Sequence, residues 1–177
     1  MMQAIYIMRQ KQPILELLLR RYSFTPMLSK RAKYGLRALV HLAQHQGEGP
    51  IQIGTIAETL NIPRKFLEAI LLDLRNEGIL QSRKGREGGY FMERSPDTIP
   101  LGRIIRFIDG PLASVPCVSQ TAYARCDDCP DERTCVLRCV LKEVRDATAK
   151  ILDGATLDQL VNKANEFSQV AELEYQI

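Results

Sequence analysis

The stretch IGTIAETLNIPRKFLEAILLDLRNEGILQSRKGREGGYFMER, residues 53–94, decides the fold of this chain. Its first eight residues place their apolar side chains at the spacing of one helical face. After a short break, Pro63 is well suited to the first position of another helix, which Gly78 ends. Two amphipathic helices joined by so tight a break predict a helix-turn-helix.

The end of this stretch, residues 79–94, predicts a β-hairpin. Two short runs with some β-propensity flank a tip that is rich in glycine and charge. A helix-turn-helix followed directly by a basic hairpin is the pattern of a winged helix.

Further amphipathic helices are expected on both sides of this stretch, at residues 29–45, 101–110, 132–153 and 156–166. Ser29 caps the first, and Thr156 with Gln159 forms a capping box for the last. Apolar side chains recur about every 3.5 residues along the long helix 132–153. This spacing is typical of a helix that packs against a partner helix. We therefore predict a mainly α fold with a small β-hairpin, a winged helix-turn-helix plus a long C-terminal dimerisation helix.

Charge is distributed unevenly over the 177 residues, although the formal net charge is only +3. Residues 27–110 carry thirteen basic and nine acidic side chains, whereas residues 111–177 carry seven and eleven. A polyanionic partner should therefore favour the first two-thirds of the chain. No apolar run approaches the roughly 20 residues that span a bilayer, and the start lacks the order of a signal peptide. We expect a cytoplasmic protein without a membrane partner.

Candidate DNA contacts lie at the start of the second helix and at the hairpin tip. The amino end of a recognition helix reaches base edges, so Arg64 and Lys65 can meet phosphates or guanine, and Glu68 can accept from cytosine. The tip adds cations at Arg83, Lys84 and Arg86, which suit the negative potential of a minor groove. The alternative is an ordinary solvated helix face and surface loop.

Four of the five cysteines lie in RCDDCPDERTCVLRC, residues 125–139, and the fifth is Cys117. Cytoplasmic thiols stay reduced, so this cluster favours a metal or redox site over a disulfide framework. Thiolates suit iron–sulfur clusters or zinc. Cys126-x2-Cys129 can place two sulfurs on one metal, and Cys135 with Cys139 could complete the site. This arrangement of four sulfurs would also suit tetrahedral zinc. Free or disulfide-forming thiols without metal are the remaining alternative.

The segments MLSKRAKYGLRALVHLA, IAETLNIPRKFLEAILLDLRNEGIL and SRKGREGGYFMERSPDTIPLGRIIRFIDGPL, with the ending VRDATAKILDGATLDQLVNKA, resemble one bacterial regulator family. It is the family that contains IscR, NsrR, RirA and CymR (the Rrf family, type two). The resemblance covers residues 27–167. It implies a dimeric winged-helix repressor or activator whose C-terminal helices cross, and many members hold an iron–sulfur cluster in the loop before that helix.

The resemblance also indicates individual residues. It places Lys65, Glu68 and Lys84 where relatives touch DNA. The full candidate DNA-binding set is Lys30, Arg31, Arg64, Lys65, Glu68, Arg83, Lys84, Arg86, Gly88, Gly89 and Tyr90.

For the cluster, the resemblance implies Cys117, Cys129 and Cys135 as ligands. Arg138 stands where some relatives have a histidine ligand, and Lys33 stands where another has an aspartate. Cys126 or Cys139 is then the candidate fourth ligand, and the cluster is [2Fe–2S] or [4Fe–4S].

The expected domains are an N-terminal extension (1–26, a disordered arm or the product of an upstream start), the DNA-binding domain (27–110), a cysteine-rich sensor loop (111–131), the dimerisation and terminal helices (132–167) and a tail (168–177). No paired carboxylates, nucleophile–base set or phosphate-binding glycine motif indicates an enzyme. We expect a homodimeric transcriptional repressor that binds a palindromic operator in double-stranded DNA and senses iron–sulfur status, oxygen or nitric oxide. The alternatives are a metal-free regulator controlled by thiol redox or by a partner protein, and a zinc-binding regulator.

Overall fold

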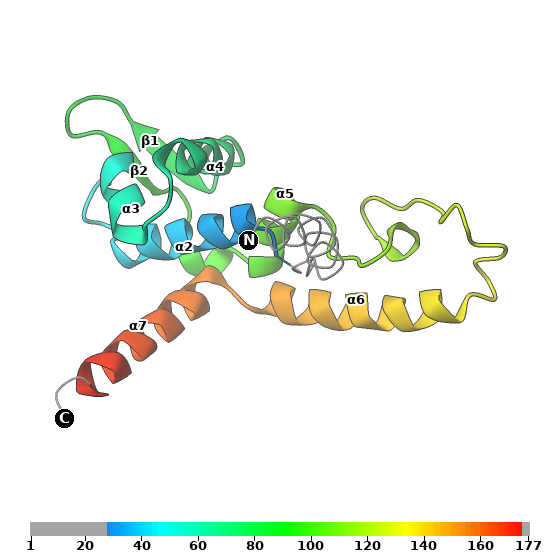
Figure 1. Ribbon diagram of the computed structural model, residues 1–177. Coiled ribbons are helices and arrows are strands. Elements are labelled where there is room, and N and C mark those ends of the chain that lie inside the picture. Colours follow the sequence, from blue (N-terminus) through cyan, green and yellow to red (C-terminus); the bar gives the residue numbers. More distant parts are fainter. Residues whose placement is uncertain (1–27, 175–177) are drawn as a thin grey trace, which may run out of the picture.

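We describe residues 28–174 of the chain from a computed structural model. The expected extension over residues 1–26 and the last three residues lie outside the described part. The elements follow one another as α2 (Lys30–Gln44), α3 (Ile53–Leu60), α4 (Arg64–Asn76), β1 (Leu80–Arg83), β2 (Gly89–Met92), the 3-10 turn η1 (Pro96–Thr98), α5 (Leu101–Asp109), the 3-10 turn η2 (Pro116–Val118), α6 (Val136–Gly154) and α7 (Leu157–Glu174). The predicted mainly α fold with a single hairpin and a winged helix-turn-helix is confirmed (Figure 1).

The helix-turn-helix is formed by α3 and α4. Asn61 ends α3 in the left-handed conformation, with φ of 50°, which asparagine tolerates better than most residues. The amide of Ile62 donates to the carbonyl of Ala57 at 2.9 Å, which closes the turn before Pro63. On α4, the buried stripe is Leu67, Ile70, Leu71 and Leu74.

The wing is the antiparallel pair β1–β2, in which Leu80 faces Met92 and Arg83 faces Gly89. Strand β2 is bonded to the loop before α3 near the tip end of the wing, because the amide and carbonyl of Tyr90 each bond to Ile51 at 2.9 Å. A side chain at Gly89 would collide with the carbonyl oxygen of Ile51, so only glycine permits this approach. The wing is thereby fixed relative to the helices.

Packing differs from the expected partition at the C-terminal end of the chain. Leu157 is fully buried and Val161 is 8% exposed, and both belong to the core formed by α2, α4 and the wing. A short antiparallel bridge holds this junction, since Leu101 donates to Ala155 at 2.8 Å and Leu157 donates to Ile99 at 2.9 Å. The start of the terminal helix α7 therefore packs into the same core as the winged helix.

The helix bounds also differ from those predicted. The long helix α6 begins at Val136 rather than near residue 132, because Asp131 accepts from the amide of Arg133 in a local turn. The capping box is present, with Thr156 and Gln159 bonding reciprocally at 3.3 and 3.4 Å. From there α7 continues to Glu174, so residues 168–174 are helical rather than a tail.

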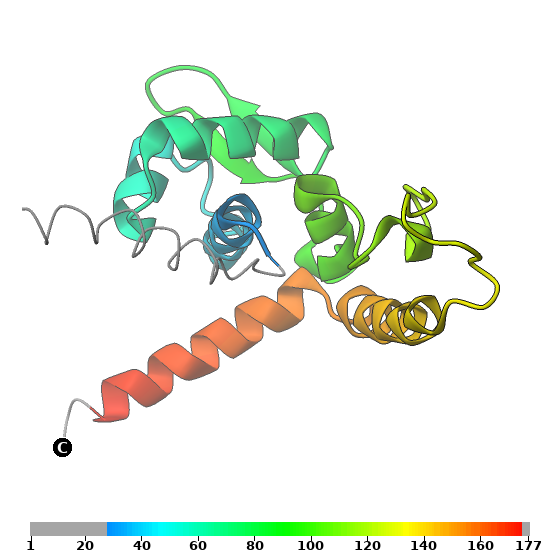
Figure 2. The same ribbon diagram turned by 45° about the vertical axis from the view of Figure 1, so that its right-hand side comes forward.

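The cysteine loop, which we define as residues 111–135, runs from the end of α5 to the far end of α6 (Figures 1 and 2). Together with α6 it projects from the body to one side, while α7 leaves in another direction. Within residues 28–174, no helix combines the length and apolar character needed to cross a bilayer.

Candidate functional site

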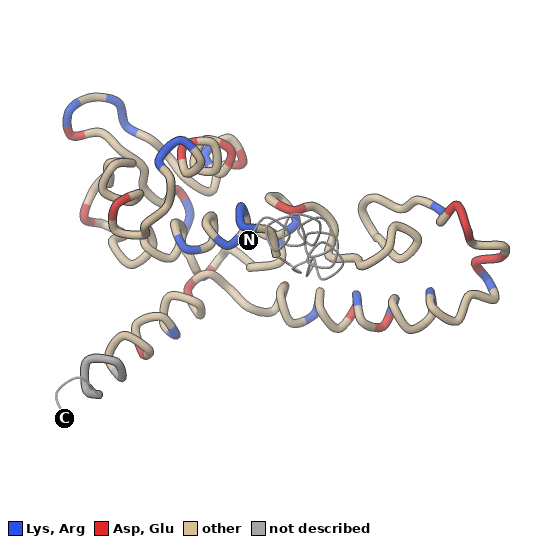
Figure 3. Tube along the Cα trace, viewed as in Figure 1, with Lys and Arg blue, Asp and Glu red and all other residues tan. Residues whose placement is uncertain are grey.

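The exposed side of α4 lies opposite its buried stripe and carries the predicted contacts. Arg64, Lys65 and Glu68 are all exposed, at the amino end of the helix. The wing presents Arg83, Lys84 and Arg86, which are also exposed. In Figure 3, basic segments gather on the wing and at the start of α4, whereas the far end of the cysteine loop is acidic. One surface therefore combines a helix start and a basic hairpin, which suits a duplex phosphate backbone.

Most other members of the predicted DNA-binding set have structural roles. Lys30 is exposed at the start of α2, but the guanidinium of Arg31 is paired with the carboxylate of Asp73 on α4. Gly88 is buried, and a side chain there would collide with the carbonyl oxygen of Arg83. Gly89 and Tyr90 begin strand β2 and lie against Ile51. These residues shape the surface that the exposed cations present.

Sequence reasoning missed part of the outward face of α4. Ala69 is exposed, and Leu72 is 40% exposed although it is a large apolar residue. Their helical positions relative to the buried stripe could have identified them, because they fall on the opposite side of the helix. Phe66 is 42% exposed and lies edge-on to Tyr34, with ring centroids 5.8 Å apart.

Neighbouring thiols of the cysteine loop affect one another's pKa. Burial, followed by a hydrogen bond with Cys126, raises the pKa of the Cys117 thiol. Burial raises the pKa of the Cys129 thiol most. The charge of Cys135, a hydrogen bond with Cys135 and the charge of Cys126 raise it further. Cys126 thus neighbours both Cys117 and Cys129, whereas Cys139 is exposed on the next turn of α6.

The thiols lie at the amino end of α6. Cys135 is the N-cap residue of the helix, and its sulfur accepts from the amide of Arg138 at 3.4 Å. Thiolates are the ligands preferred by iron–sulfur clusters and zinc, so the chemistry of the donor set fits either. In residues 28–174, however, no three of the Cys, His, Asp or Glu side chains stand in the arrangement of a metal site.

Two arginines on one face of α6, which we call the arginine clamp, hold the backbone beside Cys117. The Nε of Arg138 donates to the carbonyl of Cys117 at 3.3 Å, and the Nη1 of Arg145 donates to that of Val118 at 2.8 Å. Arg145 is only 8% exposed, and its Nη2 lies 2.6 Å from Asp146. The arginine clamp therefore attaches the backbone at Cys117 and Val118 to α6.

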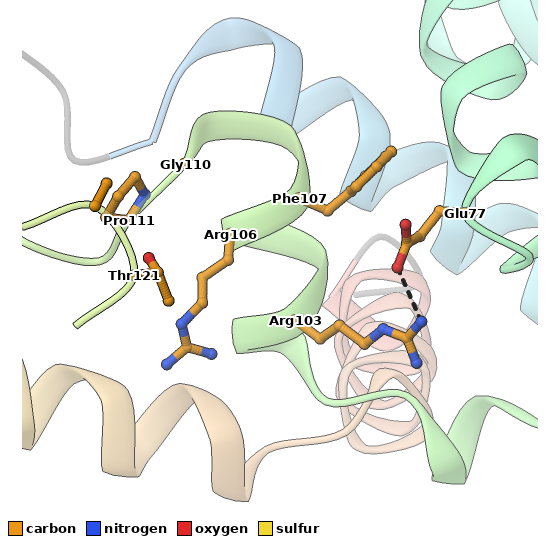
Figure 4. A pocket seen from close by; sticks show the side chains of 8 residues that line it. Glu77, Arg103, Arg106, Phe107, Gly110, Pro111 and Thr121 are labelled. Atoms are coloured by element: carbon orange, nitrogen blue, oxygen red, sulfur yellow. Dashed lines mark hydrogen bonds and ion pairs between the residues drawn. The ribbon is translucent and has the colours of Figure 1, made fainter. Parts of the chain in front are cut away.

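A cavity of about 480 Å³ separates the cysteine loop from α5 and the end of α4 (Figure 4). Phe107 and Pro111 line it together with Thr121 of the loop. Its arginines are already paired, Arg103 with Glu77 at 2.9 Å and Arg106 with Asp153 at 2.6 Å. These ion pairs join α5 to the end of α4 and to α6, so both arginines of the cavity are compensated.

The helix-turn-helix, its exposed first turn and the basic wing define a winged-helix DNA-binding protein. A model of the Rrf2 family, described as an iron-dependent transcriptional regulator, matches residues 28–163, and the chain belongs to this family. The predicted resemblance is thereby confirmed, and the family is one of transcriptional regulators, not of enzymes.

Several relatives share most of the chain. It is 38% identical, over 82% of its length and 99% of the other, to a Rhodobacter capsulatus protein described as an rrf2-like HTH-type transcriptional regulator. The solved structure of CymR, the global cysteine regulator of Bacillus subtilis, is similar with a TM-score of 0.62 at 34% identity, covering 77% of this chain and 96% of CymR. The solved structure of T. potens IscR is similar with a TM-score of 0.62 at 32% identity, covering 78% of this chain and 88% of that IscR chain.

Proposed function

We propose that this chain is a cytoplasmic, homodimeric repressor that binds a palindromic operator and whose DNA affinity depends on the chemical state of its cysteine loop. The observation that carries the proposal is the position of the thiols. Cys135 caps the helix whose opposite end joins the DNA-binding domain, and the arginine clamp ties Cys117 to the same helix. A chemical change at the thiols therefore acts on the element that orients the DNA-reading head.

Exposed cations on two elements support duplex binding. Each phosphate contact that is lost should reduce the slope of log affinity against log salt by about 1. We expect this change for Lys84→Ala in the wing and for Lys65→Ala on α4, measured by fluorescence anisotropy with a labelled operator. Lys163→Ala is the matched control, since that lysine is exposed and lies on α7, outside both elements. Equal slopes for all three variants would contradict the proposed surface.

An exposed apolar stripe on α6 supports dimerisation. Leu137, Val144 and Ile151 repeat every seven residues and are 72, 50 and 70% exposed, and Val140 between them is 53% exposed. A surface of this kind on a long helix is typical of the seam between two helices. A two-fold dimer places two recognition helices on repeated half-sites, which is why a palindromic operator is expected.

An iron–sulfur cluster is our preferred cofactor. Cys117, Cys129 and Cys135 would hold it, with Cys126 or Cys139 as the fourth ligand. When bound, the cluster supplies a centre that responds to iron, oxygen or nitric oxide by being gained, lost or oxidised. The chain's own residues then do the rest: Cys135 and the arginine clamp connect the loop to α6, and α6 connects it to the reading heads.

A metal-free thiol switch is the second candidate. The pairing of Cys117 with Cys126 and of Cys129 with Cys135 favours it, because neighbouring thiols are suited to reversible oxidation. The similarity to CymR, a cysteine regulator, is in line with this candidate, whereas the family's description as iron-dependent supports the first.

Purification without oxygen distinguishes the candidates. The cluster proposal expects a visible absorption band with matching iron and sulfide, both lost in a Cys129→Ala, Cys135→Ala variant. The exposed Cys139→Ala variant tests the fourth ligand, since it changes the cluster only if Cys139 binds it. Colourless protein without iron or zinc whose operator affinity changes with thiol oxidation would favour the second candidate. Affinity that is the same in every state would overturn the proposed regulation.

A further inference from the structure

The outward face of α4 combines charged and apolar side chains at a defined spacing. Lys65, Glu68, Ala69 and Leu72 stand at i, i+3, i+4 and i+7, and all are exposed. This is the spacing at which a recognition helix presents one face to base edges in a major groove. The face opposite is the buried stripe, so these side chains point away from the core.

The apolar part of this face requires a partner of particular chemistry. Ala69 and Leu72 can neither donate nor accept a hydrogen bond. Phe66, the other large apolar residue here, lies edge-on to Tyr34 instead. The surrounding cations of α4 and the wing select a polyanion. In the major groove of such a polyanion, the apolar group that a base edge offers is the C5-methyl of thymine.

We infer that Ala69 and Leu72 read thymine methyl groups within each half-site, beside the phosphate that Lys65 contacts and the base that Glu68 contacts. The inference rests on the proposed DNA-binding function and adds a base preference to it. Lys65 holds the helix against the duplex, and Glu68 contacts an adjacent polar base edge. The apolar pair then distinguishes thymine from cytosine by contact with the methyl group.

The test removes methyl groups from the DNA and leaves the protein unchanged. Duplexes that bind the full-length dimer are selected from a random library, and each thymine of a half-site is then replaced singly by deoxyuridine. Burial of one methyl group corresponds to about a fourfold change in affinity. We expect that loss at one or two thymines per half-site, measured by anisotropy at constant salt.

The protein variants assign the contact. In Leu72→Ala or Ala69→Ser, the thymine and deoxyuridine duplexes should bind equally at the affected position. Phe167→Ala is the control, because Phe167 is 75% exposed on α7 and its loss should leave the methyl effect intact. Thermal melting of each variant confirms that the fold is retained.

Each result decides the inference. Specific binding without any methyl dependence overturns it and leaves the proposed function standing, as does a methyl effect that persists in both α4 variants. Failure of the library to yield any bound duplex overturns the proposed function and the inference together.

Discussion

Replacing Arg145 by methionine is expected to release the backbone of Val118, next to Cys117, from α6, leaving only the bond from Arg138 to Cys117. Methionine retains much of the volume of the arginine stem but donates no hydrogen bond. The bond lost is the one at 2.8 Å to the carbonyl of Val118, which then has no donor from α6. The fold itself should persist, because Arg145 lies on α6, outside the core formed by the other helices and the wing.

The size of the effect follows from two opposing contributions. A hydrogen bond from a charged donor contributes roughly 1.5–3 kcal/mol. Against this, the Nε of Arg145 is buried and has no hydrogen-bond partner among the described groups, so removing the guanidinium also removes a desolvation cost. We expect a net loss of about 2 kcal/mol in the attachment of the loop, which corresponds to a roughly 30-fold increase in its opening.

Alkylation of the thiols measures this opening directly. Cys117 is 6% exposed, and in a tryptic digest it is the only cysteine of peptide 107–125, so mass spectrometry follows it separately. In reduced, metal-free protein, Cys117 of Arg145→Met should be alkylated roughly 30-fold faster than in the wild type. Cys139 is exposed and serves as the internal standard.

The matched control is Lys142→Met, which removes a cation from an exposed position of the same helix. An unchanged rate at Cys117 in Arg145→Met would refute the clamp. Equal acceleration of every cysteine would indicate general destabilisation of the loop, and would refute it as well.

Three further changes probe the wing, the α5–α6 contact and the dimer. Gly89→Ala forces a Cβ against the carbonyl of Ile51, so the wing should detach, and operator affinity should fall although no cation is lost; unchanged affinity would show that the wing does not contribute. Asp153→Asn removes a half-exposed ion pair with Arg106 and should lower the free energy of unfolding by about 1 kcal/mol or less. The hydrogen bond from Arg106 lowers the pKa of Asp153, so this stabilisation is complete above the unfolded pKa of about 4 and is lost as pH falls through the folded value. Urea titrations from about pH 6 to about pH 3 should show the difference between wild type and variant shrinking, and a difference that grows would contradict the assignment. Ile151→Asp places a charge in the apolar stripe of α6 and should convert dimers to monomers in sedimentation experiments, while dimers that persist would place the interface elsewhere.

Local patterns in the sequence predicted the helices and the wing well. The stripes on α3 and α4, the Ser29 cap and the Thr156–Gln159 capping box each depend on residues within a few positions of one another. Such features are determined by helix periodicity and by backbone groups at helix ends, both of which can be read directly from neighbouring residues.

Contacts between segments that are far apart in the sequence could not be predicted from these local patterns. The pairing of Arg31 with Asp73 joins residues 42 positions apart, and the bond from Arg145 to Val118 spans 27. Both depend on how the loop and helices cross in space, which periodicity does not specify. The burial of Leu157 against the winged helix was missed for the same reason, since its position in the core depends on the bridge between Ala155 and Leu101.

The chain between Gly110 and Ala155 leaves the folded head and comes back to it, and α7 completes the hydrophobic core only after that return. In architectural terms the cysteine loop and α6 form an insertion, closed at its base by the strand-like bridge. Surface insertions tolerate changes in length at little thermodynamic cost. Under the proposed function, the number of thiols in this insertion can therefore change during evolution while the winged helix keeps its shape.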